Sequence, residues 1–169
     1  MANNKWVFIL FGFISLGIIA VLSGAFVDIE IEQRKHEGFT IKGFAYEGDI
    51  TKEAFTHLYD SVIQQKNKGV LKGDMAVLFY THPSEHQKAN VIVGVINDKQ
   101  NNDEKFTVYH QKAYEEIYSI INLGEMFTPN PDNVIDAIDQ LKEEKNLKGT
   151  KYLEYYTSPT EVIQSVIID

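Results

Sequence analysis

The chain repeats part of itself at an offset of 76 residues. Residues 70–85 align with residues 146–161, and seven of these sixteen pairs are identical, where chance supplies about one. The same offset carries Gly48 to Gly124 and Asp60 to Asp136. The repeat therefore indicates a duplicated supersecondary unit that covers most of residues 28–169.

Each copy of the repeat contains one amphipathic helix. In the first copy, apolar residues recur at helical spacing over residues 54–63, and Gly69 can end the helix. In the second copy the apolar stripe covers residues 134–141, with the Asn-Pro pair at 130–131 as cap and first-turn proline and Gly149 as the end. Each helix must bury its apolar stripe against another element, and we expect that element to be a sheet.

Strand patterns lie on either side of each helix, two before it and two after it. The expected strands span residues 28–35, 39–46, 75–80, 91–96, 106–111, 114–123, 152–157 and 162–168. The sequence thus predicts an α+β fold: a duplicated β-β-α-β-β unit whose largely antiparallel sheets have two long helices on one side. Repeat one spans residues 28–96, and repeat two spans residues 106–169. The linker between them, residues 97–105, contains no apolar residue.

The first 27 residues differ from the rest. Residues 6–27 have no charge, and as a helix they would span roughly 33 Å, enough for a hydrocarbon core of about 30 Å. We expect residues 1–27 to form a single-pass transmembrane anchor with the domain outside the cytoplasm, although basic residues are nearly balanced between the two ends. The alternative is a cleaved secretory signal, since Ser23-Gly24-Ala25 resembles a cleavage site.

Charge and residue types exclude several functions. The formal net charge of −8 does not suit the phosphate backbone of nucleic acid, so no nucleic acid is expected as a partner. The absence of cysteine excludes disulfides, thiolate metal sites and a cysteine nucleophile. His82, Glu85 and His86 match the letters H-x-x-E-H of one zinc-peptidase class, but they fall in a loop after a strand, where we expect exposed histidines and no metal.

Three passages resemble the GyrI-like effector-binding family, the ligand-sensing domain found in multidrug-responsive regulators. They are GFAYEGDITKEAFTHLYDSV, VLFYTHPSE and LEYYTSPTEVIQSVI. The chain departs from the family at Glu47-Gly48-Asp49, where the family commonly has a Gly-Pro-Tyr run. The resemblance implies a non-covalent site, between the two halves, for a small, often cationic and aromatic molecule. It also implies a ligand-facing glutamate on a central strand, and the matching position is Glu154.

Strand alternation leads to the same residue, because Tyr152, Glu154 and Tyr156 share one face while Leu153 and Tyr155 share the other. We expect the second pair to meet the helix. A carboxylate flanked by tyrosine rings suits a cation. By the 76-residue repeat, Tyr80 corresponds to Tyr156. Strand alternation and the same repeat add residues of the strands 114–123 and 39–46 to the predicted face. The full set of predicted ligand-binding residues is Glu154, Tyr152, Tyr156, Tyr80, Tyr118, Glu116, Phe44 and Tyr46.

The alternative interpretation is that these residues form only the solvated face of a half-exposed sheet. The predicted function is a membrane-anchored domain that binds or senses a small molecule without a cofactor. With no recognisable nucleophile or second titratable partner, binding is favoured over catalysis. Two other functions remain: an adaptor that binds a protein partner along an edge strand, and a relative of the SOUL-type haem proteins. The second is disfavoured because no histidine falls on the predicted face.

Overall fold

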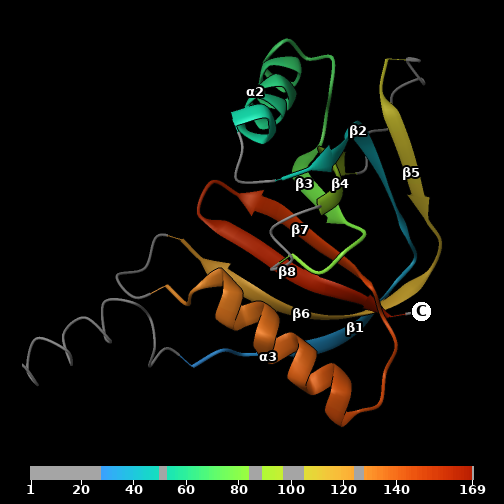
Figure 1. Ribbon diagram of the computed structural model, residues 1–169, viewed down its shortest axis with the longest axis vertical. Coiled ribbons are helices and arrows are strands. Elements are labelled where there is room, and N and C mark those ends of the chain that lie inside the picture. The colour runs from blue at the N-terminus through green and yellow to red at the C-terminus, as the bar shows by residue number, and fades with distance from the viewer. Residues whose placement is uncertain (1–27, 50–52, 84–88, 97–104, 124–127, 169) are drawn as a thin grey trace, which may run out of the picture.

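Each copy of the repeat folds as two strands, one helix and two further strands (Figure 1). The computed structural model describes residues 28–49, 53–83, 89–96, 105–123 and 128–168. The first copy comprises β1 (Glu32–His36), β2 (Phe39–Gly48), α2 (Glu53–Asn67), β3 (Asp74–Phe79) and β4 (Ala89–Ile96). The second comprises β5 (Thr107–Gln111), β6 (Tyr114–Asn122), α3 (Pro131–Glu144), β7 (Lys151–Ser158) and β8 (Glu161–Ile168). The duplicated β-β-α-β-β unit and the α+β class are confirmed.

Two predicted segments fall largely on residues outside this description. The expected anchor, residues 1–27, lies entirely outside it, and so does the linker except for its last residue. Within the described part of the chain, no helix is long and apolar enough to cross a membrane.

Two of the predicted helix ends agree with the structure, and one does not. Asn130 caps α3, and its side chain accepts a hydrogen bond from the backbone N–H of Asp132 at 3.0 Å. Gly69 follows α2 with a φ of 72°. The prediction that Gly149 ends α3 is wrong, because the helix stops at Glu144 and Asn146 takes the left-handed conformation, with a φ of 52°.

The eight strands form one antiparallel sheet in the order β1-β6-β8-β7-β3-β4-β2-β5. The predicted antiparallel pairing is confirmed, but the two halves are not separate sheets. They join where β3 pairs with β7, with Val77 opposite Glu154. The junction between the repeats is therefore the centre of the sheet.

The repeats also exchange their first strands. β1 pairs with β6 of the second copy, and β5 pairs with β2 of the first. The short connections at residues 37–38 and 112–113 consequently cross each other at one end of the sheet, near the C terminus (Figure 1). Neither copy can complete its part of the sheet alone.

Both helices cover the same face of the sheet, as predicted, and we call this the helix face. Val62 of α2 and Ile138 of α3 are fully buried in one cluster with Val77 of β3. α2 lies over β2 and β4, whereas α3 lies over β6 and β8 (Figure 1). The central strands β3 and β7 therefore run between the two helices.

The opposite face, which we call the far face, is buried by the curl of the sheet itself. Leu78, Leu153 and Ile167 form a second core there and are at most 1% exposed. The rings of Phe39 on β2 and Tyr114 on β6 lie 5.3 Å apart, although four strands separate β2 from β6 in the sheet order. Both faces of the central strands are therefore apolar and buried.

Candidate functional site

Glu154 lies on the helix face of β7, together with Tyr152 and Tyr156. Its cross-strand partner is Val77, which belongs to the core beneath the helices. Leu153 and Tyr155, predicted to meet a helix, instead lie on the far face. That prediction assumed that the more apolar face of β7 lies against a helix. It is wrong because the curled sheet buries both of its faces, so apolar side chains occur on each face.

The Glu154 carboxylate accepts hydrogen bonds from two neutral groups. Tyr156 Oη donates to Oε1 at 2.7 Å, and Gln164 Nε2 donates to Oε2 at 3.3 Å. Glu154 is half-buried. Burial raises the pKa of the Tyr156 hydroxyl, and the negative charge of Glu154 adds to this effect. The tyrosine therefore remains a neutral donor to the carboxylate at physiological pH.

Two hollows adjoin this pair. The first, which we call the Glu154 cavity, has a volume of about 20 Å³ and is lined by Phe79, Pro83, Ile135, Tyr152, Leu153, Glu154 and Gln164. The second, the Tyr156 cleft, has a volume of about 340 Å³ and is lined by Tyr59, Lys66, Asp74, Met75, Tyr156, Thr157, Ser158 and Pro159. Gln164 and Tyr59 are absent from the sequence prediction. The signal for Gln164 was its polarity within the apolar strand EVIQSVII.

Tyr152 connects the site to α3 through a half-buried polar cluster. Its hydroxyl donates to Asp139 Oδ1 at 2.7 Å, and Lys142 Nζ lies 2.5 Å from the same oxygen. Burial alone would raise the pKa of Asp139, but hydrogen bonds from Lys142, Tyr152 and His82 outweigh it and lower that pKa. For Tyr152, burial raises the pKa to about 12. These contacts hold the Tyr152 side chain in place where it lines the Glu154 cavity.

His82 is not the exposed loop histidine that the sequence suggested. Its Nε2 lies 2.6 Å from Asp139 Oδ2, its ring stands edge-on to Tyr152, and its side chain is 26% exposed. Glu85 and His86 of the H-x-x-E-H letters lie outside the described residues. Among the residues that are described, no group of three or more side chains could hold a metal ion.

Phe44 and Tyr46 lie on the helix face but at a distance from Glu154 in the sheet. Phe44 packs against Phe106, with ring centroids 5.3 Å apart, and Tyr46 packs against Phe55 of α2 at 5.7 Å. Neither lines the Glu154 cavity or the Tyr156 cleft. Tyr46 supports the first helix.

Tyr80 lies on the opposite face from Tyr156, so their predicted equivalence is wrong. The 76-residue offset holds from Leu71 to Gly73, but β3 begins at Asp74 opposite Ile96, whereas β7 begins at Lys151 opposite Ile167. Thr150 is thus one extra residue before the second strand. A one-residue slip moves every side chain to the other face, and Tyr80 packs in the far-face core.

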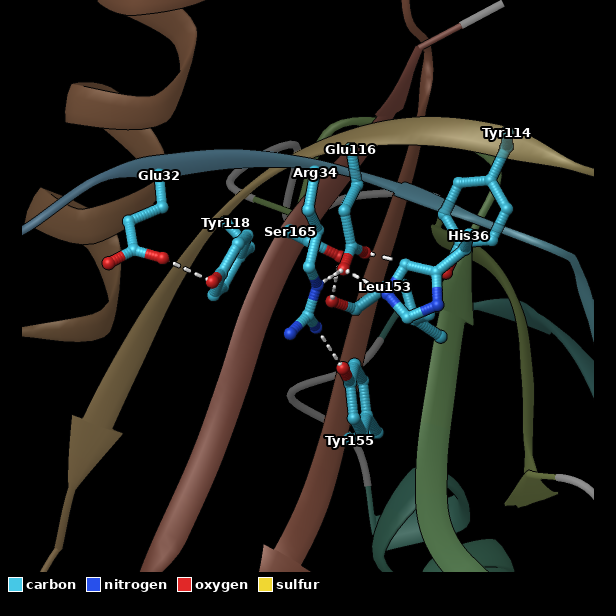
Figure 2. A network of polar contacts seen from close by, with 9 residues as sticks. All are labelled: Glu32, Arg34, His36, Tyr114, Glu116, Tyr118, Leu153, Tyr155 and Ser165. Atoms are coloured by element: carbon cyan, nitrogen blue, oxygen red, sulfur yellow. Dashed lines mark hydrogen bonds and ion pairs between the residues drawn. The ribbon is translucent and has the colours of Figure 1, made fainter.

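Glu116 and Tyr118 also lie on the far face, as part of a polar network around Arg34 (Figure 2). Glu116 is fully buried, and Arg34 Nε donates to its Oε1 at 2.7 Å. Arg34 also donates to Tyr155 Oη at 2.5 Å and lies 3.9 Å from the ring centroid of Tyr118. The guanidinium thus ties β1 to β6 and β7, and Glu116 and Tyr118 do not adjoin Glu154.

The charges of this network compensate one another. Burial alone would lower the pKa of Arg34, but its hydrogen bond to Glu116 outweighs this and raises it. Burial raises the pKa of Tyr114, and the charge of Glu116 raises it further. His36 stacks on Tyr114, and its Nε2 lies 3.0 Å from Glu116 Oε1 without the alignment of a hydrogen bond. A histidine therefore does lie beside one of the predicted ligand residues, Glu116, contrary to the sequence argument.

Known structures with this fold exist, although no family model and no curated protein matches the sequence. An integron cassette protein from the mobile metagenome of Vibrio cholerae aligns at a TM-score of 0.54 and 18% identity, over 83% of this chain and 97% of that one. The C-terminal domain of EcmrR gives 0.60 at 10% identity, over 83% and 98%. SAV2435, in a complex with tetraphenylphosphonium, gives 0.53 at 10%, over 83% and 94%. The chain therefore shares its fold with these three proteins.

Proposed function

We propose that this domain binds a small aromatic cation non-covalently beside Glu154, where the two repeats meet. The observation that supports this most is the state of the Glu154 carboxylate. It is half-buried, and within the described part of the chain its hydrogen-bond partners are the neutral groups of Tyr156 and Gln164. A partly desolvated carboxylate without a cationic partner is an unfavourable arrangement that a bound cation relieves.

The surroundings suit an aromatic body. Tyr59 and Tyr156 line the Tyr156 cleft, and Phe79 and Tyr152 line the Glu154 cavity. Aromatic faces attract cations and also pack against other rings. The likeness in fold to SAV2435, whose structure contains the aromatic cation tetraphenylphosphonium, supports the same ligand class here.

The charge of Glu154 provides the test. Glu154→Gln is expected to weaken tetraphenylphosphonium binding about 10- to 100-fold, because it keeps the side-chain shape and removes the counter-charge. The neutral analogue triphenylphosphine oxide should bind both proteins alike. Isothermal titration calorimetry measures both affinities. Glu143→Gln, at an exposed position of α3, changes the net charge equally and serves as the control.

Two outcomes would contradict the proposal. One is equal affinity of the Glu154→Gln and unchanged proteins for tetraphenylphosphonium. The other is an equal loss in the Glu143→Gln control, which would assign the effect to the overall field of an acidic protein and not to the site.

We also propose that residues 1–27, which contain the uncharged run 6–27, anchor the domain to a membrane. We expect the full chain to stay in the membrane fraction under alkaline or high-salt extraction, because an apolar span is retained by burial and not by charge. A chain of residues 28–169 should leave that fraction. Mass spectrometry of the mature N terminus separates the alternatives, since a chain beginning at Phe26 would establish a cleaved signal instead of an anchor.

A further inference from the structure

Gln164 has a buried hydrogen-bond acceptor that no donor in the described part of the chain reaches. The residue is 6% exposed on β8, and its Nε2 donates to Glu154 Oε2. Because a carboxylate only accepts, the amide nitrogen must face Glu154, which turns Gln164 Oε1 away from it. No donor among the described residues reaches this buried oxygen. Buried acceptors are almost always paired, so this one indicates a partner of another kind.

The cavity beside this oxygen is small. Gln164 and Glu154 both line the Glu154 cavity, and its volume of about 20 Å³ has room for about one water-sized group. Apolar side chains, including Phe79 and Ile135, line its other sides. A primary ammonium group fits this space, whereas three methyl groups on the same nitrogen would have to displace Phe79 or Ile135.

We propose that the preferred ligand is an aromatic compound with a primary ammonium head group, which donates N–H bonds to both the Glu154 carboxylate and Gln164 Oε1. This inference rests on the proposed function and narrows it to one class of cation. A fully substituted cation, such as a quaternary ammonium or a phosphonium, reaches Glu154 through charge alone. Charge-assisted hydrogen bonds are stronger than neutral ones, so the difference between the two classes is measurable.

The experiment compares two cations that share one aromatic body. 4-Phenylbenzylammonium and its N,N,N-trimethyl analogue are titrated into the full chain in detergent and followed by calorimetry. The unchanged protein is expected to bind the primary ammonium about tenfold or more tightly, the scale of one hydrogen bond to a charged group. Gln164→Met keeps the length of the side chain without an amide, and its preference is expected to fall severalfold, because only the N–H bonds to Glu154 remain.

Two further variants complete the set. Gln164→Glu retains acceptor oxygens in the cavity and should keep the preference for the primary ammonium, so the inference can be tested even if Gln164→Met unfolds. Gln140→Met changes an exposed glutamine of α3 in the same way and should leave both affinities unchanged.

The outcomes are distinct. Equal binding of the two cations by the unchanged protein would overturn the inference and leave the proposed function standing. An undiminished preference in Gln164→Met would show that Gln164 Oε1 takes no part in the selectivity and would also overturn it, as would loss of the preference in Gln164→Glu. Failure of every cation to bind the folded protein would overturn the proposed function and this inference with it.

Discussion

Replacing Arg34 with methionine is expected to destabilise the domain by about 3 kcal/mol, because it removes the main counter-charge of a fully buried carboxylate. Glu116 is 0% exposed, and Arg34 Nε lies 2.7 Å from it (Figure 2). Removing one partner of a buried ion pair costs more stability than the pair itself contributes, because the remaining charge is neither paired nor solvated. Urea unfolding followed by circular dichroism measures the loss.

Two variants separate this cause from others. Lys35→Met removes a positive charge at the next, exposed position of β1 and should cost less than about 0.5 kcal/mol. Arg34→Met combined with Glu116→Leu removes both charges and should recover most of the stability. If the double variant is no more stable than Arg34→Met alone, packing of the arginine stem and not the buried charge is responsible.

The order of the elements could be predicted because each depends on local periodicity and local caps. All eight strands and both helices lie where the apolar pattern and the repeat indicated. The exchange of β1 and β5 could not be predicted in this way, because nothing local in a strand identifies its partner. The exchange is also what brings Arg34 of the first copy to Glu116 of the second.

The candidate site was predictable along one strand and not across strands. Alternation along β7 correctly placed Tyr152, Glu154 and Tyr156 on one face. The extension to Tyr80 failed because one extra residue, Thr150, shifts the register, and hydrophobicity could not reveal the shift when both faces are buried.

One feature of the sequence indicates the polar network on the far face. Arg34 is the only arginine in a chain whose other basic residues are all lysine. The planar guanidinium suits a buried carboxylate and a tyrosine ring better than an ammonium group does. A single arginine on a strand therefore indicates a carboxylate or an aromatic ring as its partner, and Arg34 contacts both Glu116 and Tyr118.

The crossing of the two strand connections depends on Gly38. His36 lies opposite Tyr114 and Phe39 lies opposite Gln111, so only two residues join the strands on each side of the crossing. Gly38 has a φ of 118°, and a Cβ atom there would lie 2.4 Å from the backbone oxygen of Gln111. A backbone oxygen within a sheet ladder cannot move aside cheaply.

Gly38→Ala is therefore expected to destabilise the domain by about 3 kcal/mol or more, combining backbone strain with the displacement of β5 from β2. Gly69→Ala is the matched control, because Gly69 also has a positive φ, 72°, but no atom lies within 4 Å of its Cβ position. The control has strain without a clash and should cost about 1 kcal/mol. Urea unfolding of the two variants gives both values. Equal losses would mean that the crossing tolerates a side chain, and the strand exchange would then depend on the Arg34–Glu116 pair and not on close backbone approach.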